Sequence, residues 1–362
     1  MKRKLTAKAL ILPLLVAFLV LLPLLGAAVI GEHRYEKKHP AYLHHFWMRL
    51  LGEEDDDNVA TLAQGEGRVN VLVMGRDRAA GLTDVMILAS LNTEEHTLHM
   101  IQIPRDTYAA YTKTSYKKIN GAYAKLGGEG LCAFLHDHMG VPVDHYVCID
   151  LEVLGEMVDK MGGVHMKVPA DMDYDDPSQN LHIHLKAGEQ VLDGSMAQMF
   201  VRFRSGYAEA DVGRMDAQKL FLSSLAYDAK ENLTLAQTVS LVTHCFGKVK
   251  TDMGLGDCIR CAKALRGVDL SEMHMATLPG ASARTGGNSG AWYYILNREA
   301  SANMLADKLG GSAEAFDPMQ VFTDKKKAAF DKIYRADASS CQVRDYTAEG
   351  TLSGDVTIRR LS

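Results

Sequence analysis

The chain has 362 residues, of which 47% are hydrophobic and 23% charged, and its formal net charge is −5. This composition is that of a folded globular protein and excludes a wholly disordered chain. A negative net charge also argues against bulk electrostatic attraction to nucleic acid, so we expect no nucleic-acid partner.

An apolar run near the N-terminus predicts a membrane anchor. Residues 9–30 contain no charged side chain and are long enough, at about 20 residues, to cross a bilayer as one helix. Four basic residues lie within residues 1–8, and Glu32 follows the run, so the positive-inside rule places residues 1–8 in the cytoplasm. We therefore expect a single-pass protein of the cell membrane whose main domain is extracellular.

A cleaved signal peptide is the alternative reading of this run. Gly26-Ala27-Ala28 offers the small residues that a signal peptidase needs. The apolar part of a signal peptide is normally about 7–15 residues, which is shorter than the run found here.

The rest of the chain divides into three parts by composition. Residues 31–67 are polar and carry the acidic run 53–57, which predicts a linker or stalk. Residues 68–311 hold the periodic patterns of a folded domain. Residues 312–362 have weaker patterns and are expected to form a C-terminal appendage or a flexible tail.

The folded domain begins with strand patterns. Val69 to Met74 is a short apolar run that Gly75 ends, and the apolar runs 85–91 and 98–103 follow. The polar residues 92–97 between the last two runs predict a hairpin.

Helix and strand patterns then alternate. The expected helices are 119–126, 131–139, 151–161, 193–200, 214–229 and 233–244, and the expected strands are 146–149 and 164–168. This alternation predicts an α/β domain in which helices cover both faces of a mixed sheet.

Arginines form the most informative chemical pattern. Arg202 and Arg204 alternate as on a strand, which would place both guanidinium groups on one face. Arg214 and Gln218 are four residues apart and share one face of a helix, and Arg105 lies where an apolar strand breaks into a loop. Converging guanidinium groups suit a multiply charged phosphate. Surface arginines in ordinary ion pairs are the alternative.

Two aspartates are candidate metal ligands. Asp77 ends the first strand pattern, and Asp84 directly precedes the second. Carboxylates at neighbouring strand ends can face each other across a metal, and hard oxygen ligands beside a phosphate favour Mg²⁺. Aspartate is also common in turns for local hydrogen-bonding reasons.

Other motifs point less clearly to chemistry. His182 and His184 alternate along a strand-like run and could bind one metal, and the aspartate-rich residues 171–176 precede them. We interpret this stretch as a structural turn that leads into a strand. The chain has neither a phosphate-binding P-loop motif nor the Gly-x-Ser-x-Gly motif of serine hydrolases. The candidate functional residues are therefore the arginines and carboxylates, a combination that suits phosphoryl chemistry.

With these residues assembled, the chain resembles the LytR-CpsA-Psr family of membrane-anchored cell-envelope proteins. The matching segments are 70–77, 82–86, 103–107, 118–123, 159–164, 192–194, 200–204 and 211–218. They occur in the family's order, and the match runs from about residue 69 to residue 230. Two positions depart from the family pattern, because Ala79 and Ala217 stand where members often have arginine.

The resemblance implies a fold, an activity and residue roles. The implied fold is a three-layer α/β/α sandwich with a central mixed sheet and an apolar tunnel for a lipid tail. The implied activity is a phosphotransferase that moves an anionic glycopolymer, such as teichoic acid or capsule, from a polyprenyl-pyrophosphate carrier to peptidoglycan.

The resemblance also assigns residues. Asp77 and Asp84 would hold Mg²⁺, whereas the residues that would bind the pyrophosphate are Arg105, Arg202, Arg204, Arg214 and Gln218. The residues implied to act in catalysis are Arg105, Asp106, Arg202 and Arg204, with one carboxylate as the general base.

Two other functions remain open at this stage. The same cluster could use water and hydrolyse polyprenyl pyrophosphates or related phosphoesters. The chain could also be a non-catalytic, membrane-anchored protein that binds envelope components or has a regulatory role.

Overall fold

The computed structural model describes residues 67–77, 81–109, 111, 117–177, 181–205, 207, 211–269, 273–284, 290–312, 314, 316–317, 328–341 and 345–347. Residues 1–66, with the expected anchor at 9–30, lie outside this set. Within the described set, no helix has both the length and the apolar character needed to cross a membrane. All elements below belong to the compact unit Asn58–Ser362.

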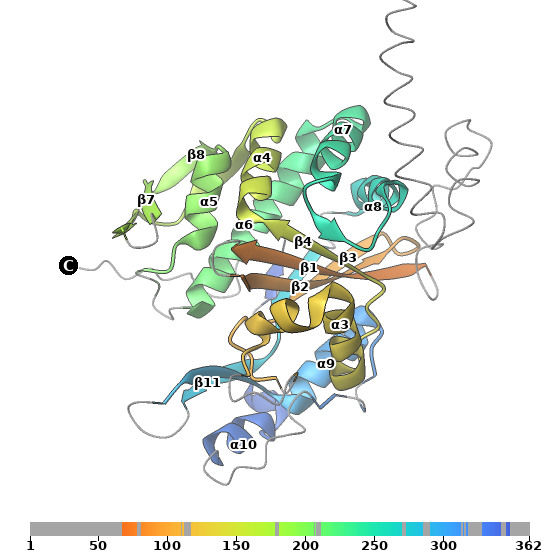
Figure 1. Cartoon of the computed structure of the whole chain (residues 1–362), viewed down its shortest axis with the longest axis vertical. Helices are drawn as coiled ribbons and strands as arrows, with labels where there is room; N and C mark the ends of the chain where they lie inside the picture. The colour runs from red at the N-terminus through yellow and green to blue at the C-terminus, as the bar shows by residue number, and fades with distance from the viewer. Residues whose placement is uncertain are drawn as a thin grey trace, which may run out of the picture. The chain divides into compact units, whose positions relative to one another are not determined.

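A seven-stranded mixed sheet forms the centre of this unit (Figure 1). In spatial order its strands are β13 (Asp345–Thr347), β10 (Met273–Thr277), β3 (Thr97–Gln102), β2 (Leu82–Asn92), β1 (Arg68–Asp77), β4 (His145–Asp150) and β9 (Lys250–Thr251). The β1–β4 and β3–β10 pairs are parallel, and the other neighbours are antiparallel. The predicted α/β class, the mixed sheet and the β2–β3 hairpin are confirmed.

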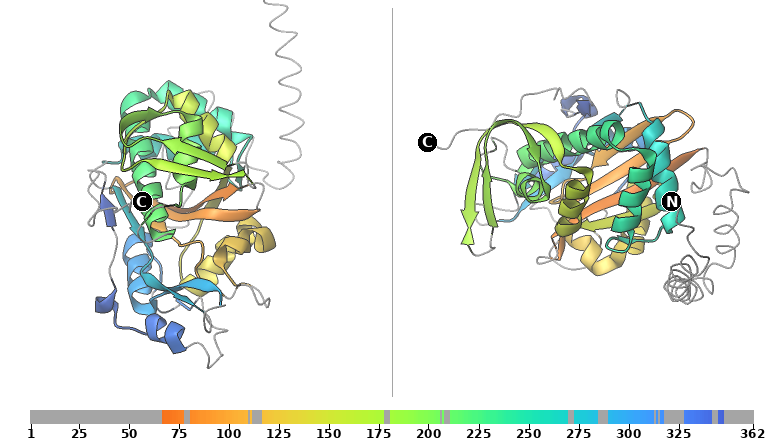
Figure 2. Two further views of the ribbon diagram at one scale, coloured as in Figure 1. Left: turned by 90° about the vertical axis from the view of Figure 1, so that its left-hand side faces the viewer. Right: turned by 90° about the horizontal axis from the view of Figure 1, so that it is seen from above.

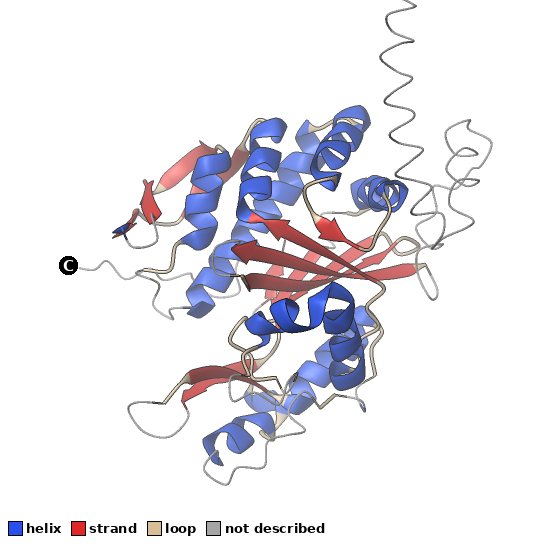
Figure 3. Ribbon diagram, in the orientation of Figure 1, coloured by secondary structure: helices blue, strands red, loops and turns tan. Residues whose placement is uncertain are grey.

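Helices cover both faces of the sheet (Figure 3). The central strands therefore bury apolar side chains on both of their faces. Leu72 and Met74 of β1 belong to the core that α3 (Ala122–Met139) and α9 (Arg298–Leu309) help to build. Val69 belongs to a second core, against which α6 (Asp211–Asn232) and α8 (Leu255–Gly267) pack. α4 (Leu151–Met161) also contacts β1 and β4.

Two small two-stranded sheets contribute to a third core beside the central sheet. They are β5 (Val164–Val168) with β8 (Gly188–Leu192), and β6 (Met172–Asp176) with β7 (Leu181–Leu185). Figure 2 shows them beside α5 (Gly194–Arg202) and apart from the central sheet, while α7 (Leu235–Phe246) lies against α8. Val164, Ile183, Phe200 and Phe221 are fully buried or nearly so in this core.

The close packing of α4 on α5 depends on two glycines. A Cβ at Gly194 would lie 2.3 Å from the carbonyl oxygen of Gly155. The Gly194 N–H donates to Asp159 Oδ1 at 2.7 Å, and Asp193 caps α5 by accepting from the Met196 N–H at 2.8 Å. These contacts fix the direction of α5 and therefore the position of its last residue, Arg202.

The predicted strand at residues 202–204 is wrong. Arg202 is the last residue of α5, and Phe203 follows in extended geometry (φ −61°, ψ 131°). The helix continues two residues past the predicted end because its buried spacing, Ala197, Phe200 and Val201, is that of a helix. The predicted turn before His182 is also wrong, since residues 172–176 form β6.

Two further regions show structure in more detail than the sequence predicted. The two helices expected at 119–126 and 131–139 are represented by the short 3₁₀ helix η2 (Ile119–Gly121) and α3, which kinks at Gly127 (φ 71°). Within residues 312–362, α10 (Ala328–Tyr334) contacts β11 (Gly280–Arg284) and β12 (Trp292–Leu296), and η7 (Ala338–Ser340) follows it.

An ion pair at one edge of the sheet makes stability depend on pH. His145 Nδ1 lies 3.2 Å from Asp252 Oδ2, and the hydrogen bond raises the pKa of His145 above its ordinary value of 6.5. Burial acts to raise the pKa of Asp252, but hydrogen bonds from His145 and from the Tyr146 N–H outweigh it and hold that pKa below 3.8.

The directions of these two pKa shifts set the pH range in which the ion pair stabilises the fold. The raised pKa of His145 stabilises the fold below pH 6.5, and this contribution is lost as the pH rises through the folded pKa. The lowered pKa of Asp252 stabilises it above pH 3.8, and this contribution is lost as the pH falls through the folded pKa. The pair therefore stabilises most between these two values.

We expect Asp252→Asn to lower the free energy of unfolding by about 1 kcal/mol inside this window and by less above it. Urea unfolding of both proteins over a pH series measures the difference. A wild-type advantage that stayed constant, or grew, as the pH rose well past 6.5 would contradict this account of the pair.

Candidate functional site

A cavity of about 370 Å³ lies between the sheet and the helices on one of its faces. It lies beside the carboxyl ends of the parallel strands β1 and β4, where α/β proteins commonly bind ligands. Its walls come from β1, β2, β4, the β6–β7 hairpin, α4, α5 and α6. The lining residues with charged side chains are Arg76, Asp84, Asp150, Arg202, Arg204 and Arg214.

The lining residues of α6 change in character along the helix. Arg214, Gln218, Phe221 and Leu222 all line the cavity, and their spacing places them on one helix face. A rise of about 1.5 Å per residue puts Leu222 about 12 Å along the axis from Arg214. The face therefore passes from charged through polar to apolar.

The strands that line the cavity also change from charged to apolar residues along its length. Residue pairing places Arg76 of β1 beside Asp150 of β4 and Thr83 of β2, so these residues share one end of the sheet. From that end, the lining of β2 runs from Asp84 to Ile87. One end of the cavity is thus charged, whereas its remaining walls are largely apolar.

Arg105 and Asp84 form an ion pair at the charged end. Arg105 Nη1 lies 2.7 Å from Asp84 Oδ1, and both side chains are partly exposed. Asp106 lies 4.0 Å from Arg105 Nε and binds Lys118 Nζ at 2.9 Å. Its carbonyl oxygen accepts from the Tyr294 N–H at 2.9 Å. These contacts tie the loop that carries Arg105 to β12.

Arg76 and Asp150 form a two-pronged ion pair on the cavity wall. Arg76 Nε and Nη2 donate to the two carboxylate oxygens at 2.9 and 3.3 Å, and the Asp150 side chain is 7% exposed. This carboxylate raises the pKa of the Arg76 guanidinium. The guanidinium also lies over the ring of Tyr123, and burial raises the pKa of that phenol to about 12.

Gln218 connects three elements at the inner end of the charged region. Its Nε2 donates to the carbonyl oxygen of Val201 at 3.2 Å, and its Oε1 accepts from Gln102 Nε2 at 3.0 Å. The side chain therefore holds α6 against the end of α5 and against β3. Among the described residues, Nε2 of Gln218 donates one of its two amide hydrogens, to Val201.

The structure brings most of the predicted site residues together. Asp84, Arg202, Arg204, Arg214 and Gln218 all line the cavity, and Arg105 reaches it through its contact with Asp84. Asp106 follows Arg105 in the same loop. Asp77 is the last residue of β1, but its side chain lies outside the described part of the chain.

Sequence reasoning missed Arg76 and Asp150 as cavity residues. They are 74 residues apart, and only the parallel β1–β4 pairing brings them together. The available signal was the position of each residue, since both stand at or near the end of a predicted strand, where side chains of an α/β protein meet a ligand.

Comparison with known proteins gives a consistent family assignment. The sequence matches the model of the LytR_cpsA_psr family over residues 48–309. It is 27% identical over 229 residues to the polyisoprenyl-teichoic acid–peptidoglycan teichoic acid transferase TagV of Bacillus subtilis strain 168, covering 61% of this chain and 59% of TagV. It is 25% identical over 264 residues to the transferase TagU of Bacillus anthracis, covering 72% of this chain and 84% of TagU.

The fold matches as well. The crystal structure of B. subtilis TagV superposes with a TM-score of 0.59 at 24% identity, over 69% of this chain and all of that one. At this level of identity the likeness establishes the fold alone. The sequence match to TagV spans less than two thirds of that relative's length.

The Arg76–Asp150 pair gives a test of how the cavity wall is held. We expect Arg76→Ala to lower the free energy of unfolding by about 1–3 kcal/mol, because it removes the guanidinium from a buried carboxylate. Asp150→Asn should cost less, since it removes the buried charge while keeping the shape. Urea unfolding at neutral pH measures both.

Arg335→Ala is the matched control, because Arg335 pairs with Asp331 on an exposed helix surface. It should leave stability close to that of the wild type. Equal losses for Arg76→Ala and Arg335→Ala would show that the Arg76–Asp150 pair does not support the wall.

Proposed function

The chain belongs to the LytR_cpsA_psr family, and on that premise we propose that it transfers an anionic glycopolymer from a polyprenyl-pyrophosphate carrier to peptidoglycan. The polymer is teichoic acid, a capsular chain or a similar anionic glycan. The observation that carries this proposal is a cavity with arginines at one end and an apolar interior, since such a carrier has an anionic head and an apolar tail.

The charged end suits the diphosphate. Arg202, Arg204 and Arg214 reach one cavity from the end of α5, the following loop and the first turn of α6. Guanidinium groups bind phosphate oxygens in pairs, and the N-terminus of a helix also favours an anion. In this account Arg105 binds a further oxygen when the diphosphate competes with Asp84 for its guanidinium.

The apolar interior suits the lipid. Ile87, Leu154, Phe221 and Leu222 offer hydrocarbon surface from β2, α4 and α6. Each methylene group buried from water contributes about 0.8 kcal/mol, so the tail supplies binding energy away from the reacting phosphorus. That energy can position the diphosphate against the arginines.

The reaction joins an acceptor to the polymer. An oxygen of a peptidoglycan hydroxyl forms a bond to the phosphorus that carries the polymer, and the bond from that phosphorus to the bridging oxygen breaks. Polyprenyl phosphate leaves, and the hydroxyl proton passes to a base at the charged end. Negative charge grows on the bridging oxygen, so the arginines stabilise the transition state more than the ground state.

We also propose Mg²⁺ as the cofactor. Asp84 presents a carboxylate at the cavity, and Asp77 ends the neighbouring strand, so the donor set consists of hard oxygens beside a phosphate site. Bound there, Mg²⁺ would supply charge neutralisation to the diphosphate. Asp106, held by Lys118, fits a role in positioning the Arg105 loop.

We propose that the protein is anchored in the cell membrane with its folded domain outside the cell. Residues 9–30 would anchor the chain as a single transmembrane helix and hold the domain outside the cell. The lipid carrier and the enzyme would then share one membrane and meet by diffusion in its plane. Peptidoglycan would be reached from the same side.

Substituting Arg202 or Arg204 tests the role of the arginines. We expect Arg202→Ala and Arg204→Ala each to lower transfer at least about 100-fold, because each removes stabilisation of the leaving diphosphate. Stability should stay near that of the wild type, since Arg204 is exposed and Arg202 is half-buried. Arg284→Ala, at an exposed arginine of β11, should leave transfer unchanged and serves as the control.

The assay follows polymer attached to peptidoglycan and polyprenyl phosphate released, using purified full-length protein in detergent. Near-normal transfer by both variants would remove the arginine assignment. Release of polyprenyl phosphate without polymer attachment would identify a hydrolase instead. Binding of the lipid without any turnover would identify a non-catalytic binding protein.

A substitution inside the cavity tests the lipid site. Leu154 is half-buried on α4 and lines the cavity, so Leu154→Trp should fill part of the apolar space. We expect KM to rise for long-chain carriers and to change little for carriers with a short tail. An equal rise for both tail lengths would show that the tail does not occupy this space.

A further inference from the structure

The outer face of the β6–β7 hairpin gathers two aspartates and two histidines. Asp173 and Asp175 alternate along β6, and His182 and His184 alternate along β7, so each pair lies on one face of its strand. The strand register sets Asp173 opposite His184 and Asp175 opposite His182. All four side chains therefore project from the same face of the hairpin.

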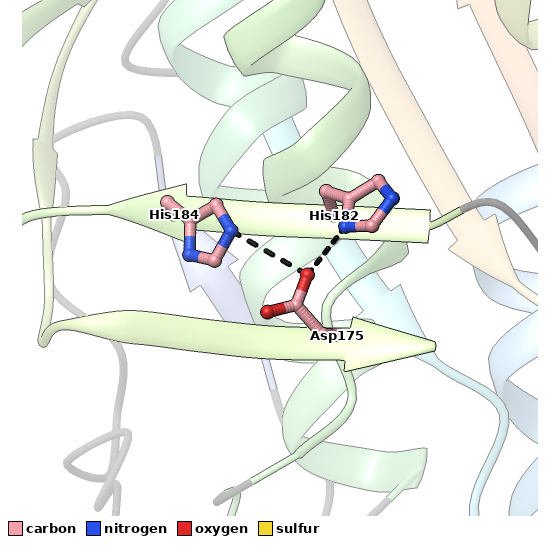
Figure 4. Close-up of side chains that lie close together, drawn as sticks. All are labelled: Asp175, His182 and His184. Atoms are coloured by element: carbon pink, nitrogen blue, oxygen red, sulfur yellow. Dashed lines mark hydrogen bonds and ion pairs between the residues drawn. The ribbon is translucent and has the colours of Figure 1, made fainter. Parts of the chain in front are cut away.

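One ring nitrogen of each histidine faces the carboxylate of Asp175 (Figure 4). His182 Nδ1 lies 2.5 Å from Asp175 Oδ1, and His184 Nε2 lies 3.5 Å from the same oxygen. His184 Nδ1 lies 2.7 Å from Asp173 Oδ1. One carboxylate oxygen is thus shared by two imidazoles that come from positions two apart on one strand.

We propose that this face binds a first-row transition metal ion of the zinc type through His182, His184 and Asp175. One ligand atom from each of these residues lies within 4.8 Å of the other two. Tetrahedral zinc with bonds of about 2.0–2.1 Å requires its ligands to lie about 3.4 Å apart. Small side-chain rotations bring these ligands to that spacing, and Asp173 or water completes the coordination.

The ligand types select the metal. Imidazole nitrogen favours Zn²⁺, Cu²⁺ and Ni²⁺, whereas Mg²⁺ and Ca²⁺ prefer sites made of oxygen alone. This site therefore differs in kind from the oxygen donor set proposed for Mg²⁺ at Asp84.

Ordinary ion pairing explains the cluster less well. On the same hairpin, Asp171 binds Lys186 Nζ at 3.1 Å and accepts from the Ala187 N–H at 2.8 Å. Lys186 is thus engaged by Asp171, while Asp173 and Asp175 face imidazoles. Zinc binds through deprotonated imidazole nitrogens and carboxylate oxygens, and these are the groups that the outer face of the hairpin presents together.

The position of the hairpin gives the metal a structural consequence. On its inner face, Ile183 and Leu185 are buried, and Tyr174 and Leu181 line the cavity. A two-stranded sheet alone is only marginally stable in water. A metal that joins β6 to β7 would therefore stiffen one wall of the cavity, and this holds whatever the cavity binds.

The test measures zinc binding by the full-length protein in detergent. Zn²⁺ is titrated in competition with a chromophoric chelator for the wild type, Asp175→Asn, and the double variant His182→Gln/His184→Gln. We expect Asp175→Asn to weaken the site at least about tenfold, and the double variant to lose one zinc equivalent per chain. Mg²⁺ in excess should not displace the bound zinc.

His136→Gln is the matched control, because His136 is exposed and its Nδ1 lies 3.1 Å from the carboxylate of its chain neighbour, Asp137. It should bind zinc as the wild type does. Zinc should also raise the unfolding temperature of the wild type and of His136→Gln, but not that of the double variant.

The proposal fails if the double variant keeps the wild-type stoichiometry and affinity. It also fails if Mg²⁺ or Ca²⁺ displaces zinc readily, since the site would then be an oxygen site. All four side chains are more than half exposed, so these substitutions leave the core intact. Asp175→Asn keeps the size of the side chain and therefore tests the carboxylate separately from the two histidines.

Discussion

The structure depends on guanidinium groups of like charge being held close together at one end of an apolar cavity. Four arginines lie among the described residues that line it, and they would repel one another if they stood alone. Asp84 and Asp150 lie among them, and their carboxylates bind Arg105 and Arg76. These aspartates offset part of the repulsion between the guanidinium groups.

The fold supplies this arrangement through a few packing constraints. Parallel pairing of β1 with β4 sets Arg76 beside Asp150, and the glycine contact between α4 and α5 fixes the end of α5. Gln218 then ties α6 to the end of α5, so that the apolar residues of α6 continue inward from Arg214. A charged end and an apolar interior of the same cavity follow from these contacts, and together they suit the proposed lipid diphosphate.

Local patterns predicted much of this from sequence. The helix at 151–161 and the strand at 164–168 were predicted to the residue, because apolar periodicity and the glycines 162 and 163 define their ends. The arginine cluster was also predicted, although Arg202 proved to end a helix. The Arg76–Asp150 pair and the antiparallel pairing of β6 with β7 were not predicted. Both depend on strand register, which brings together residues that no local sequence pattern relates.

The most direct measurement of the central claim is a crystal structure of the full-length protein with a polyprenyl pyrophosphate. We predict that the diphosphate contacts Arg202, Arg204 and Arg214, and that the tail runs past Leu154 and Phe221 between the sheet and α6. A lipid bound on another surface, with these arginines in contact only with protein carboxylates, would contradict the account.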